Sequence, residues 1–426
     1  MSSQLLVLPK AKSEAEIMAC YCLRAMEPVS KHKKSRNISI MTHRSNDTNL
    51  TDLDELRKQV TDIMQLIRSR TPRLTFPHNE AKASEIWEGN LDGKAIERII
   101  IYLRSRGCFW ALKLGSASHE FLAGCLDCEH SVAETTFGTA VSAESYFEQF
   151  MMEYKKYDFS KYPMLCLYNE GNFFNEDELP INARNSILQC IADNPHIKTL
   201  VLECIPQFIT RKNLEETKKI LGEKHVEIAI GLESSNPVIR TICVNKPFNL
   251  KQFEIVADLV NEYFTLLSYV LIKPSFLTEA EALEDAINTV RYAYSVGTKV
   301  VSLEPVSIGQ NTMSGALHQL GLYRTAWLWT VIEIAKTAHE IGEVRIGGYQ
   351  FAPKYNYHAE NCEVCTSRVK HLIRDYNSSY DISILENADC ECKSKWQYEL
   401  AEQQPPLLKR VPFLIEKLRE VYSEKM

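Results

Sequence analysis

Short apolar runs alternate with amphipathic helical segments through the middle of the chain, from about residue 95 onward. The runs cover 98–105, 164–169, 197–204, 226–233, 266–273, 299–305 and, as a shorter candidate, 343–348. Nearly continuous apolar strands that alternate with helices are typical of a parallel sheet buried on both faces. Six or seven such units predict an α/β fold, a full or partial (β/α) barrel of parallel strands with its active residues at the C-terminal strand ends. A doubly wound sheet is the alternative, and the pattern does not decide whether the barrel closes.

The regions on either side of this pattern differ from it. We expect an N-terminal extension over residues 1–84, the barrel over 85–350, and a cysteine-rich C-terminal region over 351–426 that ends in a helix. The extension contains a polar, mobile connector and then apolar residues at helical spacing from Leu53 to Ile67. The basic run Lys31–Arg36 could contact phosphates, although a solvated charge cluster explains it more simply. We expect the first 70 residues to be peripheral, and this amphipathic helix to pack on another element without taking part in chemistry.

Composition restricts the class of protein and its compartment. A hydrophobic fraction of 45% and a charged fraction of 24% are ordinary for a globular protein. No apolar run approaches the roughly 20 residues that span a bilayer, and the polar N-terminus favours a cytoplasmic location over secretion. Thirteen cysteines in such a chain favour reduced, partly metal-bound thiols over disulfides. The net charge of -6 provides no overall attraction for nucleic acid, although a local basic patch could provide one.

Three cysteines follow the first predicted strand. Cys108, Cys125 and Cys128 have the spacing C-x16-C-x2-C. Thiolates are good ligands for iron–sulfur clusters and for zinc. Three ligands to a four-iron cluster leave one iron open, and the first βα loop would place that iron at the mouth of the barrel. A zinc site with His119 or His130 as the fourth ligand is the alternative.

Several segments in order along residues 85–400 resemble the radical SAM (S-adenosylmethionine) superfamily, and within it the branch of elongator-type proteins and archaeosine-forming tRNA enzymes. The segments include "IIIYLRSRGCFW", "GCLDC", "LYNEGNFFNEDELP", "IAIGLESSNPVIRTICVNKPF" and "YVLIKPSFLTEAEALEDAINTV". The resemblance implies that the three cysteines bind a [4Fe-4S] cluster whose open iron takes the amino and carboxylate groups of S-adenosylmethionine. One-electron cleavage would yield a 5'-deoxyadenosyl radical that abstracts hydrogen from the substrate. An electron donor of the flavodoxin or ferredoxin type is implied, and a partner enzyme is compatible with the resemblance.

Two positions depart from the pattern of the superfamily. Asp127 stands before the third cysteine, where relatives usually have an aromatic residue that packs near the adenine. Ile205 stands before Pro206, where relatives often have arginine. The first departure puts the adenine contacts in doubt, and the second indicates an altered polar network or a substrate without the relatives' anionic group.

Polar residues at the ends of the later strands are the candidates for cofactor and substrate contacts. The resemblance places Asn169, Glu170 and Gly171 near the methionine amino group, and Glu203 in a carboxylate-containing segment of the branch. A carboxylate at the end of a buried strand is costly unless it has a partner, which favours function for such residues. We predict cofactor contacts for Glu203, Glu233, Ser234 and Lys273, and catalytic roles for Glu203 and Glu304. A structural salt bridge between Lys273 and Glu304 is the alternative for that pair.

A second cysteine group lies near the C-terminus. Cys362, Cys365, Cys390 and Cys392 form C-x2-C and C-x-C pairs with 24 residues between them. Four thiolates in paired short spacings predict structural zinc in a closed site. A second, auxiliary iron–sulfur cluster is the rival interpretation.

Two functions from different classes follow. The first is a radical SAM enzyme acting on a modified tRNA nucleoside or on a small or carrier-bound metabolite. The second is a non-catalytic, zinc-stabilised scaffold or partner subunit of a modification complex. The sequence does not decide the substrate, the bond that changes, whether the cofactor is consumed, or the oligomeric state.

Overall fold

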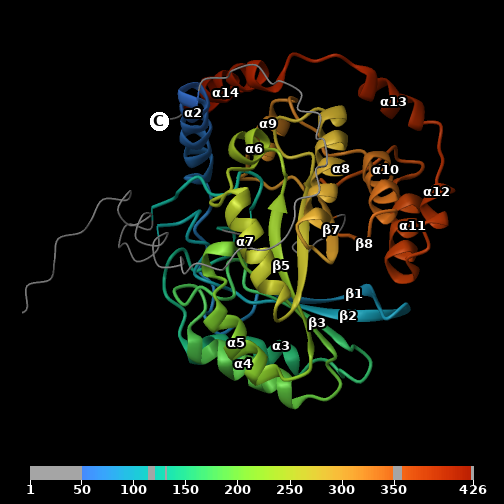
Figure 1. The fold of residues 1–426 in the computed structure, drawn as a ribbon. Helices are drawn as coiled ribbons and strands as arrows, with labels where there is room; N and C mark the ends of the chain where they lie inside the picture. The colour runs from blue at the N-terminus through green and yellow to red at the C-terminus, as the bar shows by residue number, and fades with distance from the viewer. Residues whose placement is uncertain (1–49, 114–119, 130–131, 349–356, 424–426) are drawn as a thin grey trace, which may run out of the picture. The chain divides into compact units, whose positions relative to one another are not determined.

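The computed structural model describes residues 50–113, 120–129, 132–348 and 357–423, and an eight-stranded sheet lies at the centre of these residues (Figure 1). The strands are β1 (Ala83–Leu91), β2 (Lys94–Tyr102), β3 (Met164–Tyr168), β4 (Thr199–Glu203), β5 (His225–Glu233), β6 (Thr265–Ile272), β7 (Val300–Pro305) and β8 (Glu343–Ile346). They pair in chain order, and every pair from β2 to β8 is parallel. All seven predicted strands are confirmed.

The first strand, β1, was not predicted. It pairs antiparallel with β2 through a two-residue turn at Asp92 and Gly93, both of which have positive φ. Asn90 Oδ1 accepts a hydrogen bond from Gly93 N at 2.9 Å. Asp-Gly is a common sequence for such a turn, so a signal for the hairpin was present in the sequence.

Helices connect successive parallel strands. The crossover helices are α3 (Ala143–Tyr154), α4 (Ile181–Asp193), α5 (Arg211–Leu221), α7 (Leu250–Asn261), α8 (Glu279–Ser295) and α10 (Leu328–His339). Short elements precede some of them: η1 (Pro206–Phe208), α6 (Pro237–Ile239), the π-helical turn η2 (Arg240–Val244) and α9 (Met313–Gln319). Thr278 and Glu281 form a capping box at α8, and Asn249 and Gln252 form one at α7, so polar side chains mark where these helices begin.

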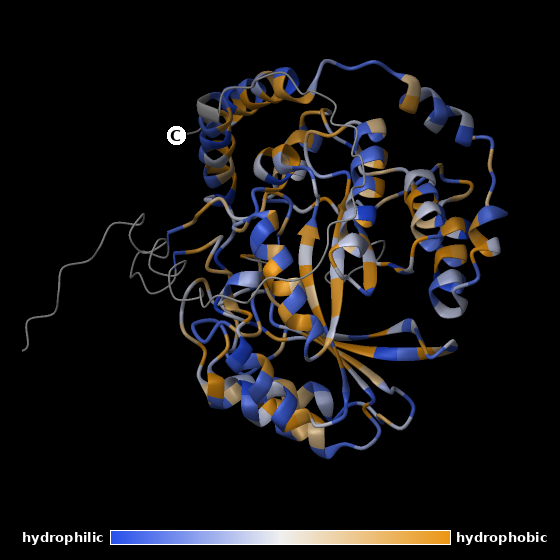
Figure 2. Ribbon diagram, in the orientation of Figure 1, coloured by the Kyte–Doolittle hydropathy of each residue, from blue (hydrophilic) through white to orange (hydrophobic). Residues whose placement is uncertain are grey.

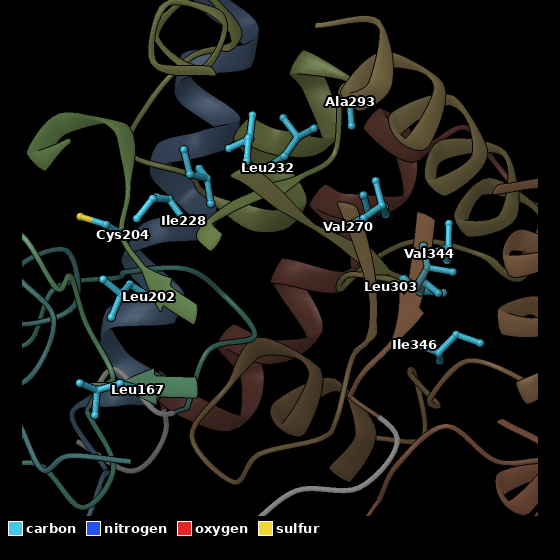
Figure 3. Packing of buried hydrophobic residues seen from close by; sticks show 14 of the residues in the cluster. Leu167, Leu202, Cys204, Ile228, Leu232, Val270, Ala293, Leu303, Val344 and Ile346 are labelled. Carbon is cyan, nitrogen blue, oxygen red and sulfur yellow. The ribbon is translucent and has the colours of Figure 1, made fainter. Parts of the chain in front are cut away.

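The main hydrophobic core lies between the sheet and these helices. Leu202 and Ile228 pack in it, among the residues drawn in Figure 3. Val201 and Ala229, their neighbours along the strands, belong to a separate cluster on the inner face. Successive side chains of a strand point to opposite faces, which is why strands that are apolar throughout serve both clusters. Figure 2 shows these strands largely in the hydrophobic colour.

The sheet curls into a partial barrel. Within the described residues β1 and β8 do not pair, and α11 (Thr366–Ser379) contacts β1, β2 and β8 instead. Asn377 of α11 accepts a hydrogen bond from Ile346 N at 3.0 Å and donates one to Ile346 O at 2.8 Å, as a neighbouring strand would. Asn90 of β1 donates to Ser378 O at 2.7 Å. A helix therefore covers the gap between the two edge strands.

The remaining helices correct one expectation. They are α2 (Leu50–Arg68), α12 (Ser383–Glu386), α13 (Lys393–Ala401) and α14 (Leu407–Ser423). The apolar face of α2, with Val60, Ile63 and Met64, is buried in a second core together with α14 and α9. The predicted amphipathic helix that packs on another element is confirmed, but the prediction that this part of the chain is peripheral was wrong. The basic run Lys31–Arg36 lies outside the described residues. None of the described helices is long and apolar enough to cross a membrane.

Candidate functional site

A cavity of about 390 Å³ lies on the inner face of the sheet. All eight strands contribute to its lining, as do the loops that follow their C-terminal ends. Cys108, Cys125 and Cys128 line it together, although 16 residues separate the first two. The triad therefore lines the cavity at the carboxyl ends of the barrel strands, and its role as a cluster site stays a prediction.

The thiols of the triad are less tightly gathered than those of the second cysteine group. Among the described residues, one group of cysteine, histidine or acidic side chains has all its ligand atoms within 4.8 Å of one another, and it is not this triad. The thiolates that hold a cubane bind different irons, so they lie farther apart than the ligands of one ion. Burial raises the pKa of the Cys125 thiol to about 11 and that of Cys108 well above its usual range, so both favour the neutral thiol unless a metal binds. The alternative ligands His119 and His130 lie outside the described residues.

Asp127 fixes the loop between the second and third cysteines. Its carboxylate accepts hydrogen bonds from Ser275 Oγ at 2.6 Å, Ser275 N at 2.8 Å and Ser314 N at 3.0 Å. Burial raises the pKa of Asp127, and these hydrogen bonds oppose that rise. The residue that replaces the usual aromatic side chain therefore ties the cysteine loop to the segment after β6 and to α9.

The π-helical turn η2 holds the same loop from another direction. Asn245, which follows η2 with positive φ, donates from Nδ2 to Gly124 O at 2.8 Å. Its carbonyl accepts from Trp110 Nε1 at 2.8 Å, and Leu126 N donates to Val244 O at 3.1 Å. Nothing in the sequence pattern singled out Asn245, because its partners are more than 100 residues away.

Glu170 and Gly171 line the cavity after β3, whereas Asn169 does not. Glu170 Oε1 lies 2.5 Å from Lys82 Nζ, and each of the two side chains is 2% exposed. Lys82 precedes β1 and was not predicted. Neither amide atom of Asn169 has a hydrogen-bond partner among the described residues.

Glu178 explains why residue 171 is glycine. A Cβ at Gly171 would lie 2.2 Å from Glu178 Oε2. The Glu178 carboxylate accepts from Phe109 N at 3.0 Å and Asn172 N at 2.5 Å, which links the first cysteine to the segment after β3. Burial raises the pKa of Glu178 to about 7 despite these hydrogen bonds. Sequence analysis missed this residue.

Four glutamates that line the cavity lie at or near the C-terminal ends of strands, namely Glu170, Glu203, Glu233 and Glu304. Burial raises the pKa of Glu203 to about 8, and the other three carboxylates add to the rise. Burial also raises the pKa of Glu304 to about 7, against a 2.6 Å hydrogen bond from Ser302 Oγ. Both side chains therefore hold a proton over part of the neutral range.

Lys246 is a second cation beside these glutamates, in addition to Lys82. Its Nζ lies 3.2 Å from Glu233 Oε1. Burial lowers the pKa of Lys246, but Glu233 and Cys125 nearby raise it above its ordinary value. A Cβ at Gly231 would lie 2.2 Å from Glu233 Oε1 and 2.9 Å from Lys246 Nζ, so a larger residue there would displace this ion pair. Lys246 lies within a quoted segment but was not predicted as a site residue.

Ser234 and Lys273 do not line the cavity. Ser234 Oγ donates to Asp285 Oδ1 at 2.7 Å. Lys273 Nζ lies 2.6 Å from Glu279 Oε2 in a buried ion pair, so the alternative of a Lys273–Glu304 salt bridge was wrong. Cofactor contacts for these two residues and for Asn169 stay predictions without support from the cavity.

The inner part of the cavity is aromatic and basic. Tyr168 and Tyr269 place their hydroxyls 3.3 Å apart. Arg345 makes a bidentate ion pair with Glu227 at 2.6 and 2.8 Å. Arg98, four residues before the end of β2, also lines the cavity, and its Nη1 lies 3.9 Å from Cys166 Sγ. The cavity therefore has carboxylates near the strand ends and two guanidinium groups, those of Arg98 and Arg345, elsewhere in its lining.

The four C-terminal cysteines form the group with ligand atoms within 4.8 Å of one another. The Sγ–Sγ distances are 3.7 Å from Cys362 to Cys365, 3.7 Å from Cys362 to Cys390 and 3.6 Å from Cys365 to Cys392. Four thiolates at a Zn–S distance of about 2.3 Å form a tetrahedron with edges of about 3.8 Å. Trp329 Nε1 lies 3.3 Å from Cys392 Sγ. This donor set and its spacing fit one tetrahedral ion.

Comparison with known proteins places the chain in a family. No family model matches it. Archaeosine synthase subunit beta of Methanosarcina acetivorans is 30% identical over 350 residues, which cover 80% of this chain and 95% of that protein. The chain belongs to the archaeosine synthase subunit beta family. Archaeosine synthase subunit beta of Thermococcus kodakarensis is 25% identical over 320 residues, 73% of this chain and 94% of that protein.

Solved structures resemble this member of the archaeosine synthase subunit beta family only remotely. The structure of methylornithine synthase (PylB) has a TM-score of 0.42 and 10% identity, and covers 84% of this chain and 91% of its own. The archaeal Elp3 of Methanocaldococcus infernus has a TM-score of 0.39 and 13% identity, covering 55% and 58%. Likenesses at this level support no inference about function. The resemblance to the archaeosine-forming branch is confirmed by the relatives in the preceding paragraph.

Proposed function

We propose that this chain is a radical SAM enzyme in which Cys108, Cys125 and Cys128 hold a [4Fe-4S] cluster. The observation that carries the proposal is the meeting of three widely spaced cysteines with strand-end carboxylates in one cavity. Membership of the archaeosine synthase subunit beta family supports it. When bound, the cluster would supply one-electron reduction of S-adenosylmethionine, with the electron from a flavodoxin- or ferredoxin-type donor, which is the radical chemistry that the resemblance implies.

The residues of the chain supply position and protonation around that chemistry. Glu170 and Gly171 line the cavity, and the Glu170 carboxylate would accept hydrogen bonds from the amino group of the cofactor. Glu233 forms an ion pair with Lys246, and its charge adds to the rise that burial causes in the pKa of Cys125. Glu233 would therefore orient the cofactor at the cluster. Glu203 and Glu304, with pKa values of about 8 and 7, can hold or accept a proton at a carboxylate oxygen near neutral pH.

We propose a modified tRNA nucleoside as the substrate class and a second subunit as the partner. The support is that the relatives are named archaeosine synthase subunit beta. The inner part of the cavity has room and polar groups for the reacting part of such a substrate, with Tyr168, Tyr269 and Arg98 in its wall. A small or carrier-bound metabolite is the other substrate class.

We propose further that Cys362, Cys365, Cys390 and Cys392 bind structural zinc. Their Sγ–Sγ distances support a single tetrahedral ion over an auxiliary cluster. No cavity residue belongs to this group, so the ion would stabilise the fold and take no part in the reaction.

The test uses the full chain, purified and reconstituted without oxygen. Iron, sulfide and zinc are quantified, and 5'-deoxyadenosine is measured after dithionite and S-adenosylmethionine are added. We expect about four irons, about one zinc and formation of the nucleoside. A Cys108/Cys125/Cys128→Ala variant should lose the iron and the product and keep the zinc. The matched control is Cys190→Ala, which removes a thiol of α4 that contacts Met151 and lies outside the cavity.

Two results would contradict the proposal in different ways. Zinc at both cysteine groups without cofactor cleavage would support the non-catalytic scaffold. About eight irons and no zinc would keep the enzyme but replace the structural zinc with a second cluster.

A further inference from the structure

Arg68, the last residue of α2, lies against the loop that carries the second and third cysteines. Its Nε donates to Ala123 O at 2.5 Å, and its Nη2 donates to Cys125 O at 2.6 Å and to Cys128 O at 2.9 Å. One guanidinium therefore binds the backbone carbonyls of two of the three triad cysteines. The planar guanidinium group suits this binding of several carbonyl groups, because its N–H donors are fixed relative to one another.

The charge of Arg68 is buried beside the triad. Arg68 is 0% exposed, and the negative charges that act on it come from the three triad cysteines and from Asp127. Its Nη1 is buried and has no hydrogen-bond partner among the described residues. A buried cation with an unused donor is costly unless negative charge compensates it. A cluster bound by three thiolates carries net negative charge, and the carbonyls of two of those cysteines already point at Arg68.

Other residues of α2 hold Arg68 in this position. Gln65 Nε2 donates to Phe121 O at 2.7 Å, on the same loop. Arg57 donates from Nε and Nη2 to Asn245 Oδ1 at 3.1 and 3.0 Å. Asn245 in turn binds Gly124 O. The helix thus contacts the cysteine loop both directly and through η2.

We infer that Arg68 is a positioning residue for the cluster, which fixes the Cys125–Cys128 loop and supplies the positive charge behind it. The inference rests on the proposed function. Reduction adds one negative charge to the cluster, so a nearby buried cation favours the reduced state, and charge and hydrogen bonds are known determinants of cluster potential. The N-terminal helix is then part of the metal site.

The experiment compares Arg68→Met, Arg68→Lys and the control Arg70→Met in reconstituted full-length protein. Arg70 stands two residues later, donates from Nη2 to Tyr422 O at 3.0 Å and lies 4.0 Å from the centre of that ring, away from the cysteine loop. Iron release into a chelator and the midpoint potential, from a redox titration followed by electron paramagnetic resonance, are measured without turnover.

We expect Arg68→Met to release iron at least tenfold faster than wild type and to have an equilibrium constant for one-electron reduction at least tenfold smaller, a shift of about 59 mV toward more negative potential. Arg68→Lys should also release iron faster, because an ammonium group cannot make the same set of hydrogen bonds to the loop carbonyls. Its midpoint potential should stay near that of wild type, because the positive charge is kept. If Arg68→Met does not fold, iron release from Arg68→Lys against Arg70→Met decides the positioning role.

The outcomes separate this inference from the proposed function. Wild-type iron release and potential in both Arg68 variants would overturn the role of Arg68 and leave the enzyme intact. If Arg70→Met changed iron release and midpoint potential as much as Arg68→Met, the effect would come from the charge of the helix in general. That result would also overturn the role of Arg68. Wild-type protein without iron would overturn the proposed function and, with it, this inference.

Discussion

The two cysteine groups of this chain differ in spacing, in setting and in what surrounds them. The triad lines a cavity with carboxylates, and it is not the group whose ligand atoms all lie within 4.8 Å of one another among the described residues. The C-terminal group has four thiols within 4.8 Å of one another, and two of them, Cys365 and Cys392, are buried among core residues. A closed set of four ligands leaves a metal no position for substrate, whereas three ligands beside a cavity leave one open.

The two groups are also held differently. Cys365 immediately precedes α11, and Cys392 immediately precedes α13, so regular helices set the C-terminal geometry. Long-range side-chain contacts hold the triad loop instead, from Arg68, Asp127 and Asn245. A site built on a loop needs such contacts from surrounding elements to reach a defined geometry.

The largest expected effect is loss of the triad. Cys125→Ala should reduce formation of 5'-deoxyadenosine at least 10³-fold, because a cluster with two remaining ligands is not retained. The melting temperature should change little, since the loop is held by other residues. Anaerobic product assays and calorimetry check both statements, and a large loss of stability with activity retained would reverse the assignment of the two groups.

The converse effect is expected at the C-terminal group. Cys365→Ala should remove zinc and destabilise the protein by about 4 kcal/mol or more, because it opens a buried metal site in the core. Iron content per folded molecule should stay at the wild-type level. Zinc analysis and denaturant unfolding measure this, and equal loss of iron and zinc would show that the two sites are not independent.

A smaller effect is expected when the hydrogen-bond donor next to the C-terminal thiols, Trp329, is replaced. Trp329→Phe removes the Nε1–H that lies 3.3 Å from Cys392 Sγ. Zinc affinity should fall about tenfold, within the range for partners of metal ligands. Competition with a chromophoric chelator gives the affinity. The matched control is Trp396→Phe, whose Nε1 donates to Thr330 Oγ1 at 2.8 Å and not to a thiol, and an equal loss there would attribute the effect to packing.

The smallest effect is a change in the pH dependence of the free energy of unfolding, caused by one glutamate of the cavity. Glu203 has a pKa of about 8, above the value of about 4.5 for an exposed glutamate. The folded state therefore keeps a proton that the unfolded state loses, and stability falls as pH rises from about 4.5 to about 8. Glu203→Gln should flatten that fall and raise the melting temperature at pH 8 by a few degrees. An unchanged slope would show that Glu203 is ionised in the folded protein.

Much of the fold could be predicted from local pattern. The apolar runs predicted every parallel strand, because a strand buried on both faces must be apolar throughout. The hairpin strand β1 was missed although its Asp92-Gly93 turn carried a signal, since one face of β1 is polar and its pattern is weak.

For the site, the sequence by itself determined the cysteines and the strand-end carboxylates. Their spacing and their position after apolar strands are local properties, and the cavity holds the triad with Glu203, Glu233 and Glu304. The tertiary structure alone decided their partners. Lys273 pairs with Glu279 and not with Glu304, and Glu178 meets Phe109 N from 69 residues away.

Arg68 shows most clearly what only the tertiary structure decided. In the sequence it is one more basic residue at the end of an amphipathic helix, and its contacts lie 55 to 60 residues later. Spacing along the chain predicts which residues share a helix face or a strand edge. Contacts between elements depend on how the helix packs against the barrel, and only the folded core sets that.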